Sequence, residues 1–191
     1  MIFSQAHQNA IEKGKEFHLE NPTWSGTDSK HYLKYTKKLA KYYNIKNILD
    51  YGCGKGLQYE KGYMDKIGIE DAYLYDPCVS KYNKFPPKGA KFDAILCMQV
   101  IKHIPDEDLP ALKQFFEQTA TKFVLIADVD PSVPSKKKKQ LIQDWRNRDN
   151  AFYKSMFADT WSSSAKLYFA WHQPMDTKAK EDNLKIQEIR V

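Results

Sequence analysis

Glycine occupies every second position in a short stretch that opens with an acid: Asp50-Tyr51-Gly52-Cys53-Gly54-Lys55-Gly56. Alternating glycines let the backbone turn sharply and approach a ligand closely, because no Cβ stands in the way. The apolar residues before the stretch predict a strand, and residues 57–67 after it are typical of a helix. A strand, a glycine turn and a helix N-terminus in this order favour the binding of a nucleotide-like cofactor.

A second candidate binding group, Asp76, stands where the next predicted strand ends. Residues 72–75 form a short apolar run, and Asp76 and Pro77 follow it directly. A carboxylate at the end of the strand after a glycine turn can accept hydrogen bonds from ribose hydroxyls. The glycine turn and this acid together indicate a site for a nucleotide-like cofactor much more strongly than the glycines alone.

Three stretches resemble the class I S-adenosylmethionine (SAM) dependent methyltransferases. Residues 50–56 resemble their nucleotide-binding turn, residues 73–77 their second strand with its ribose-binding acid, and residues 92–105 (FDAILCMQVIKHIP) their fourth strand and following loop. The glycine spacing differs from the G-x-G-x-x-G of NAD enzymes and from a P-loop. The resemblance covers roughly residues 48–127 and implies SAM as the cofactor, bound by Asp50, Tyr51, Gly52, Cys53, Gly54, Gly56, Asp76, Pro77 and Gln99.

The loop after the third stretch departs from the pattern of the resembled family. The family commonly has an acid where this chain has Gln99, and a glutamate where it has Lys102. An amide can form hydrogen bonds but cannot act as a base, and Lys102 reverses the local charge. His103 is in place as a candidate general base, because an imidazole titrates near neutral pH. We predict His103 and Gln99 as catalytic residues, with a structural histidine as the alternative.

The order of predicted elements indicates a single α/β domain, Rossmann-like, with a mostly parallel sheet. Residues 1–46 would form an N-terminal helical segment that acts as a lid, and residues 47–191 the SAM-binding part of the same domain. Only residues 77–92, rich in proline and glycine, separate the second strand from the next one. We therefore expect the family's third strand to be missing or vestigial. Residues 165–171 and 183–191 are expected to close the sheet as an antiparallel hairpin.

Helical periodicity recurs in the N-terminal segment. Residues 4–20 are typical of a helix, Asn21-Pro22 ends it, and a second helix follows a cap at Asp28 or Ser29. A loop between them carries Trp24, which could belong to a lid over cofactor or substrate. Apolar residues at helical spacing predict the buried face of the second helix, and lysines lie mostly on its other side; the apolar set is Tyr32, Tyr35, Leu39, Tyr42 and Tyr43.

Bulk properties indicate a folded cytoplasmic protein. The chain has 191 residues, 42% of them hydrophobic, which is enough for one domain with a full core. No apolar run approaches the length of a membrane span, and the N-terminus does not resemble a signal peptide. The three cysteines, Cys53, Cys78 and Cys97, lack metal-ligand spacing, so we expect reduced thiols and no metal site.

Charge gives the best indication of the substrate. The chain has 30 Lys and Arg residues and 24 Asp and Glu residues, which give a net charge of +6. The densest basic cluster is residues 136–139. A lysine-rich helix start is usually solvated, but it can also attract a phosphorylated or carboxylated small molecule. Trp145, Arg146 and Arg148 would add contacts to a nucleic acid. We predict methyl transfer to O or N of a small polar or anionic metabolite. The alternatives are an RNA or protein methyltransferase, or a SAM-binding module without catalysis.

Overall fold

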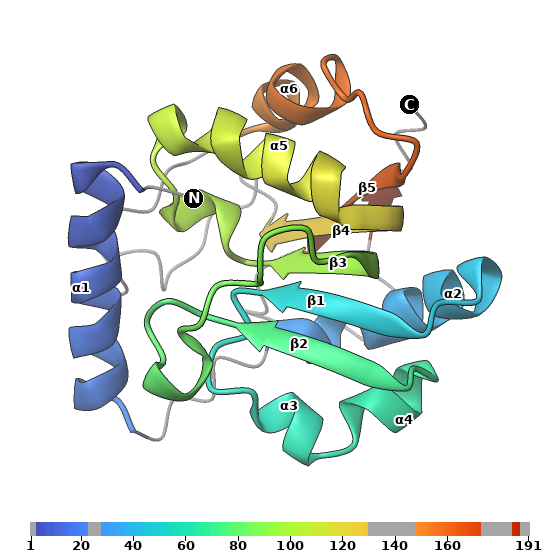
Figure 1. Ribbon diagram of the computed structural model, residues 1–191, viewed down its shortest axis with the longest axis horizontal. Coiled ribbons are helices and arrows are strands. Elements are labelled where there is room, and N and C mark those ends of the chain that lie inside the picture. The colour runs from blue at the N-terminus through green and yellow to red at the C-terminus, as the bar shows by residue number, and fades with distance from the viewer. Residues whose placement is uncertain (1–2, 23–27, 130–147, 173–184, 188–191) are drawn as a thin grey trace.

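The computed structural model of the chain describes residues 3–22, 28–129, 148–172 and 185–187. Six strands form one sheet in the order β2-β1-β3-β4-β5-β6 (Figure 1). The first five pair in parallel and β6 pairs antiparallel to β5. Their bounds are β1 (Asn47–Tyr51), β2 (Asp71–Tyr75), β3 (Phe92–Met98), β4 (Ala120–Val129), β5 (Lys166–His172) and β6 (Lys185–Gln187). The predicted parallel sheet with a C-terminal antiparallel hairpin is confirmed.

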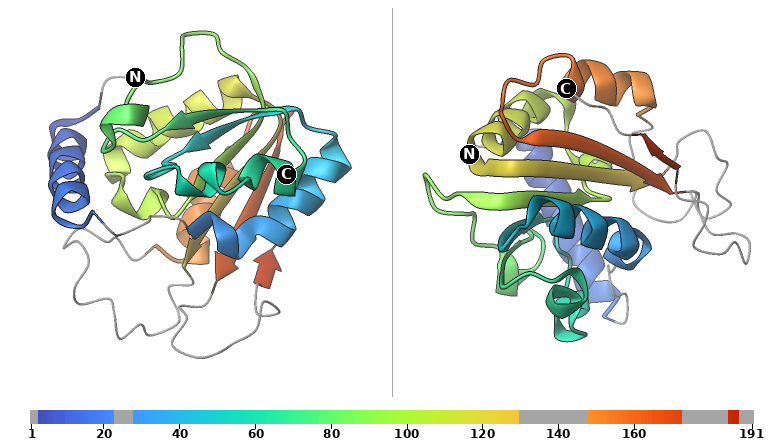
Figure 2. Two further views of the ribbon diagram at one scale, coloured as in Figure 1. Left: turned by 90° about the horizontal axis from the view of Figure 1, so that it is seen from below. Right: turned by 90° about the vertical axis from the view of Figure 1, so that its right-hand side faces the viewer.

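Helices cover both faces of this sheet (Figures 1 and 2). The helices α5 (Leu109–Thr119) and α6 (Asn150–Tyr153) lie on one face, where α6 continues into a π-helical turn (Lys154–Ala158). The helices α2 (Leu33–Tyr43), α3 (Leu57–Glu60) and α4 (Tyr63–Ile67) lie on the other. Because both faces are covered, the central strands are apolar on both sides, which is typical of a parallel sheet. The domain therefore has three layers.

The position of a third strand beside β2 is not filled by any described strand. Residues 76–91 contain one short 3-10 helix, η2 (Ser80–Tyr82), before the chain enters β3. Phe85 of this connection packs its ring against Tyr75 and Phe115, at centroid distances of 5.1 and 4.8 Å. One aromatic side chain thus covers sheet surface that a crossover helix would otherwise cover. The prediction that the third strand is missing is confirmed.

Helix α1 (Gln5–Glu20) lies beside the carboxyl ends of the parallel strands (Figure 1). Ser4 caps it, since its hydroxyl accepts a hydrogen bond from the N–H of His7 at 3.2 Å. The helix ends at Asn21, as its sequence predicts. The next helical segment begins with the 3-10 helix η1 (Asp28–Tyr32), which leads into α2. The structure does not test the division into a lid and a cofactor-binding part.

Several local predictions were wrong. The helix predicted over residues 57–67 is two short helices, because Gly62 between them has a φ of 74° and ends the first. The acidic residues 106–108 are typical of a helix N-terminus, but they form a separate 3-10 helix, η4 (Asp106–Asp108), before α5 begins. Tyr42 is 78% exposed, whereas its spacing predicted a buried side chain.

Other predictions fall outside the described residues: these are the loop with Trp24, the basic cluster at residues 136–139, and Trp145 and Arg146. Among the described helices, none is long and apolar enough to cross a membrane. No group of three or more His, Cys, Asp or Glu side chains in the described part of the chain is placed to hold a metal ion.

Candidate active site

The glycine turn follows β1 with the conformation that its sequence predicts. Gly52, Gly54 and Gly56 all have positive φ, of 84°, 59° and 68°. A Cβ at Gly52 would lie 2.1 Å from Cγ2 of Val100, and one at Gly56 would lie 2.7 Å from the ring of Tyr82. Glycine is therefore required twice over, by backbone conformation and by close packing. Gly52 also brings the turn into contact with the loop after β3.

Asp76 joins the turn directly. The N–H of Gly54 donates to Oδ2 of Asp76 at 2.9 Å, and the N–H of Cys78 donates to Oδ1 at 2.9 Å. Burial raises the pKa of this carboxyl, and the two backbone donors counteract that rise. A carboxylate has about four acceptor positions, so this one can still accept a hydrogen bond from a ligand. The two strongest sequence motifs therefore form one site.

Asp50 is the acid at the base of the turn. Its Oδ2 accepts hydrogen bonds from the hydroxyl of Tyr59 at 2.6 Å and from Nε2 of Gln58 at 3.3 Å. Both donors belong to α3, so Asp50 fixes the helix to the turn. Burial raises the pKa of Asp50 to about 6, and the charge of Asp76 adds to the rise.

The raised pKa of Asp50 predicts a pH-dependent stability. In the folded protein this carboxyl stays protonated up to a pH of about 6, whereas in the unfolded chain it ionises near its ordinary value of 3.8. Between these values the folded state binds more protons, so the free energy of unfolding falls as the pH rises. We expect Asp50→Asn to reduce this fall, measured as thermal midpoints from pH 4 to pH 7. Asp159→Asn, at an exposed acid, is the control. Equal pH profiles for Asp50→Asn and the natural protein would contradict the prediction.

The side chains of Tyr51 and Cys53 point into the protein. Tyr51 packs on Tyr75 and Phe116, at ring-centroid distances of 5.1 and 5.4 Å. Cys53 is buried, and burial raises the pKa of its thiol far above the ordinary value. Only their backbone atoms are thus placed to meet a cofactor. Contact of the cofactor with these two residues and with the half-buried Pro77 stays a prediction.

Gln99 directly follows β3. It has a φ of 65°, a conformation that is unusual for a non-glycine residue. Its N–H donates to the carbonyl of Ala127 at 2.7 Å, and its Nε2 donates to the hydroxyl of Tyr32 at 2.9 Å. Lys102 donates to its Oε1. An ammonium can only donate, so Lys102 fixes which way the amide faces. Residues in such sparsely populated conformations concentrate at functional sites.

Lys102 is buried and has an acidic neighbour. Its Nζ lies 3.6 Å from Oδ1 of Asp128, and Oδ2 of Asp128 accepts a hydrogen bond from the hydroxyl of Tyr153 at 2.8 Å. The expectation that Lys102 reverses the local charge is therefore corrected, because Asp128 balances it. Asp128 itself lies within β4, near the carboxyl end of that strand. Gln99 and Lys102 are two parts of one hydrogen-bonded network.

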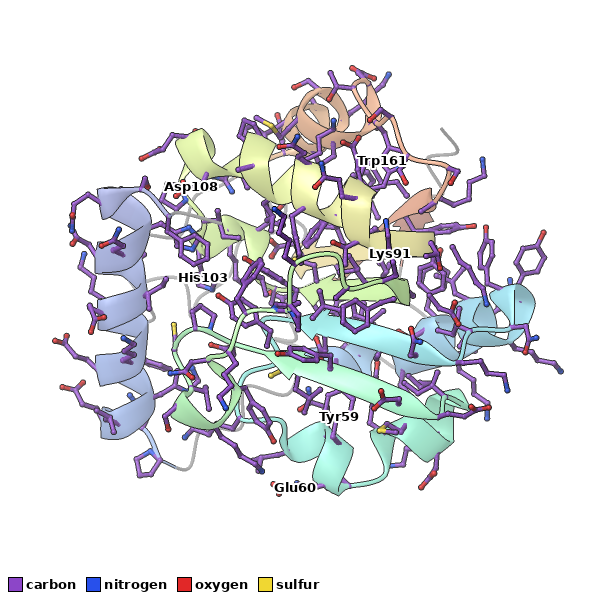
Figure 3. All side chains as sticks on the ribbon, in the orientation of Figure 1. Tyr59, Glu60, Lys91, His103, Asp108 and Trp161 are labelled. Atoms are coloured by element: carbon purple, nitrogen blue, oxygen red, sulfur yellow. The ribbon has the colours of Figure 1, made fainter. Side chains whose placement is uncertain are left out.

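His103 lies one turn further along, in the 3-10 helix η3 (Ile101–His103). Figure 3 shows His103 and Asp108 at the edge of the sheet nearest α1. The His103 side chain is half-buried, and the backbone N–H of His103 donates to the carbonyl of Val100 at 2.9 Å. It therefore belongs to the same loop as Gln99, beyond the carboxyl end of β3.

Arg148 holds this loop in place. Its guanidinium donates to the carbonyls of Ile101 and Ile104, on either side of His103, and to the carboxylate of Asp106. Arg148 is buried, so the expectation that it adds a guanidinium contact to a nucleic acid is wrong. Its charge is used inside the protein to order the loop.

Removal of this contact is expected to destabilise the protein. Arg148→Met would leave two buried carbonyls without their donor, at a cost of about 3 kcal/mol in the free energy of unfolding. Denaturant titration measures the change. Lys154→Met, at an exposed basic residue on the same segment, should have little effect. Equal stabilities of the two variants would show that Arg148 is dispensable.

Hydrogen bonds attach both ends of helix α1 to residues beyond the carboxyl ends of the strands. At its start, Asp108 accepts hydrogen bonds from the N–H and hydroxyl of Ser4, at 3.1 and 2.7 Å, and lies 3.1 Å from Nδ1 of His7. At its end, the ammonium of Lys55 donates to the carbonyls of Asn21 and Pro22, both at 2.9 Å. Lys55 belongs to the glycine turn itself, so the turn and the helix are directly connected.

The middle of α1 also contacts the site. A Cβ at Gly14 would lie 2.5 Å from Sγ of Cys78, so the helix packs closely on the residues after Asp76. The charges of Asp76 and His18 also interact: Asp76 opposes the lowering of the His18 pKa that burial causes. α1 therefore extends from the start of α5 to the glycine turn and passes over Asp76.

Several residues of the site were not identified from the sequence. They are Tyr32, Lys55, Gln58, Tyr59, Asp108 and Tyr153. Only Lys55 had a local signal, since it lies inside the glycine turn. The others come from elements whose contacts depend on the tertiary fold.

The fold and the site define a Rossmann-like domain with a nucleotide-binding glycine turn, an acid after β2 and a candidate general base after β3. The profile of the methyltransferase domain family matches residues 24–164. The chain therefore belongs to the methyltransferase domain family, and this assignment implies SAM as the cofactor. No curated protein sequence matches it.

The solved structures that match this chain resemble its fold only weakly. A SAM-dependent methyltransferase from Archaeoglobus fulgidus has 17% identity and a TM-score of 0.37, over 61% of this chain and 60% of the other. An inhibitor-bound glycine decarboxylase has 10% identity and a TM-score of 0.42, and the match covers 92% of this chain and 38% of the other. A histidinol-phosphate aminotransferase from Clostridium acetobutylicum has 10% identity and a TM-score of 0.32, over 89% and 46%. The chain spans less than two-thirds of each of these structures, and the family assignment does not depend on them.

Proposed function

We propose that the protein transfers the methyl group of SAM to an oxygen or nitrogen of a small polar or anionic metabolite. The observation that carries the proposal is the position of α1, which lies along the carboxyl edge of the sheet and is attached at both ends. A macromolecular acceptor needs an open approach to the transferring methyl group. A covered site favours an acceptor small enough to be enclosed with the cofactor.

Burial of the site residues supports the same conclusion. Asp76 and Gln99 are each 8% exposed, and Asp50 is 3% exposed. Because water is largely excluded there, hydrogen bonds and charges act more strongly than they would on an open surface. An acceptor would be oriented by a few polar groups, which is the usual composition of a small-molecule site.

The residues present would hold SAM in the following way. Asp76 would accept hydrogen bonds from the ribose hydroxyls, the backbone of the glycine turn would lie under the cofactor, and Asp50 would order that turn. When bound, SAM supplies an already activated methyl group, so the protein has to place the acceptor in line with it. His103 would take the acceptor's proton, and Gln99 would orient donor or acceptor by hydrogen bonding.

Transfer of labelled methyl groups from SAM tests the proposal. The purified protein is incubated with three fractions of a cell extract, one of small molecules, one of RNA and one of protein. We expect label in the small-molecule fraction alone, and expect His103→Ala to reduce it. Label in RNA or protein would favour the macromolecular alternative. SAM binding with no labelled product in any fraction would favour a binding module without catalysis.

A further inference from the structure

The missing third strand leaves the outer edge of β2 open. In the pairing with β1, the N–H of Asp71 donates to the carbonyl of Lys46, and the carbonyl of Tyr75 accepts from the N–H of Gly52. Because alternate residues of a strand face opposite edges, Ala72 and Leu74 direct their N–H and carbonyl groups away from β1. Within the described part of the chain, only one of these four groups forms a hydrogen bond. It is the N–H of Ala72, which donates to the carboxylate of its neighbour Asp71 at 2.8 Å.

Apart from the charged Asp71 at its amino end, this edge lacks the features with which proteins usually protect an exposed strand. Lysine, proline and bulges commonly prevent edges from pairing with other chains. Residues 72–75 of β2 are Ala-Tyr-Leu-Tyr, with no charge, no proline and a regular register to β1. Ala72, Tyr73 and Leu74 are each only partly buried. An unprotected, apolar edge of this kind favours a partner strand.

We propose that β2 pairs with β2 of a second copy of this chain, so that two sheets join into one across a twofold axis. The axis passes beside Tyr73, and the two strands run antiparallel. In this register Ala72 of each copy lies opposite Leu74 of the other. The N–H of Leu74 donates to the carbonyl of Ala72 in the second copy. The N–H of Ala72 donates to the carbonyl of Leu74 there, in place of the Asp71 carboxylate that accepts it in the single chain. All four outward groups of each copy are then satisfied, because the edge is complementary to itself.

The residues around β2 are compatible with this register and limit the length of the ladder between the two strands. The carbonyl of Tyr82 accepts a hydrogen bond from the N–H of Asp76 at 3.0 Å, so the edge is closed beyond Tyr75. The ladder therefore covers Asp71 to Tyr75, all of β2. Exposed Asp71 lies at the amino end of this ladder and exposed Lys84 near its carboxyl end, where the Lys84 carbonyl accepts from the hydroxyl of Tyr73. An antiparallel arrangement brings opposite charges of the two copies towards each other.

Sedimentation equilibrium of the full chain tests the proposal, with Leu74→Pro as the decisive variant. Proline removes the outward N–H of Leu74, and an edge strand tolerates it there because that N–H makes no bond to β1. Leu74→Ala shortens the side chain but retains the N–H, so it is the matched control. We expect a dimer for the natural protein and for Leu74→Ala, and a monomer for Leu74→Pro. A thermal unfolding scan shows whether Leu74→Pro is folded, and Ala72→Pro is a second variant of the same kind.

Hydrogen exchange gives an independent readout on the natural protein. The amide of Leu74 should exchange slowly at protein concentrations where the dimer forms and quickly after dilution. A natural protein that is a monomer at all concentrations would overturn the proposal. So would a dimer that persists in folded Leu74→Pro, or one in which the Leu74 amide exchanges quickly. None of these results depends on SAM binding, so they separate this proposal from the proposed function.

Discussion

SAM binding is expected to disappear in Gly54→Val. Gly54 has a φ of 59°, a conformation that a β-branched residue adopts only with strain, and its N–H donates to Asp76. The substitution would shift the turn, move that N–H away from Asp76 and place a side chain where the cofactor should lie. Asp76→Ala should weaken SAM binding by ~1–3 kcal/mol, because charge-assisted hydrogen bonds to the ribose are lost. Titration calorimetry with SAM and with its demethylated product measures both effects.

Gly89→Val is the matched control for Gly54→Val. Gly89 has a φ of 82°, and a Cβ there would meet nothing within 4 Å, so the variant carries similar backbone strain outside the site. It should lower stability but bind SAM normally. Unchanged SAM binding in both Gly54→Val and Asp76→Ala, or tight binding of NAD by the natural protein, would contradict the assignment of this turn to SAM.

Turnover should fall ~10²-fold or more in His103→Ala, once an acceptor is known, while the affinity for SAM stays nearly constant. This is the size of effect expected when a general base is lost. The pH profile of turnover should also lose an ionisation near neutral pH. Steady-state kinetics and calorimetry on the same preparation separate the effect on chemistry from the effect on binding.

His103→Gln is a useful companion to His103→Ala. It keeps hydrogen-bonding capacity but cannot take up a proton in the neutral range, so both variants should lose turnover equally. If only His103→Ala is impaired, or if it unfolds the protein, the histidine has a structural role. Methyl transfer would then depend on the positioning of the reactants. Asp128 would be the next residue to test, although its hydrogen bond from Tyr153 and its pairing with Lys102 already use it structurally.

The sheet could be predicted from the sequence because its signals are local. Apolar runs before the glycine turn and before Asp76 predicted β1 and β2, and residues 92–105 were predicted to contain the strand observed as β3. The short connection between Asp76 and Phe92 gave the missing third strand, since too few residues remain for a strand and a crossover helix. The pairing of the glycine turn with Asp76 followed from the order of these elements.

The rest of the site depends on contacts between distant residues, which no local pattern reveals. Ser4 meets Asp108 across 104 positions, and Tyr32 meets Gln99 across 67. The balance of the Lys102 charge by Asp128 required the positions of two neighbouring strands. Besides Lys55, Gly62 was a local signal that was overlooked, because a glycine between two short helical patterns allows a helix to stop there.

The neutral environment of Gln99 has a consequence for inhibition by the product. SAM and its demethylated product differ by one methyl group and by the positive charge on sulfur. An acid at position 99 would attract that charge, whereas an amide does not, and the ammonium of Lys102 has Asp128 beside it. The expected main anchors, Asp76 and the glycine turn, would contact parts of the molecule that donor and product share. We therefore expect the product to compete with SAM at similar affinity, so that the methylation rate in a cell would follow the ratio of the two.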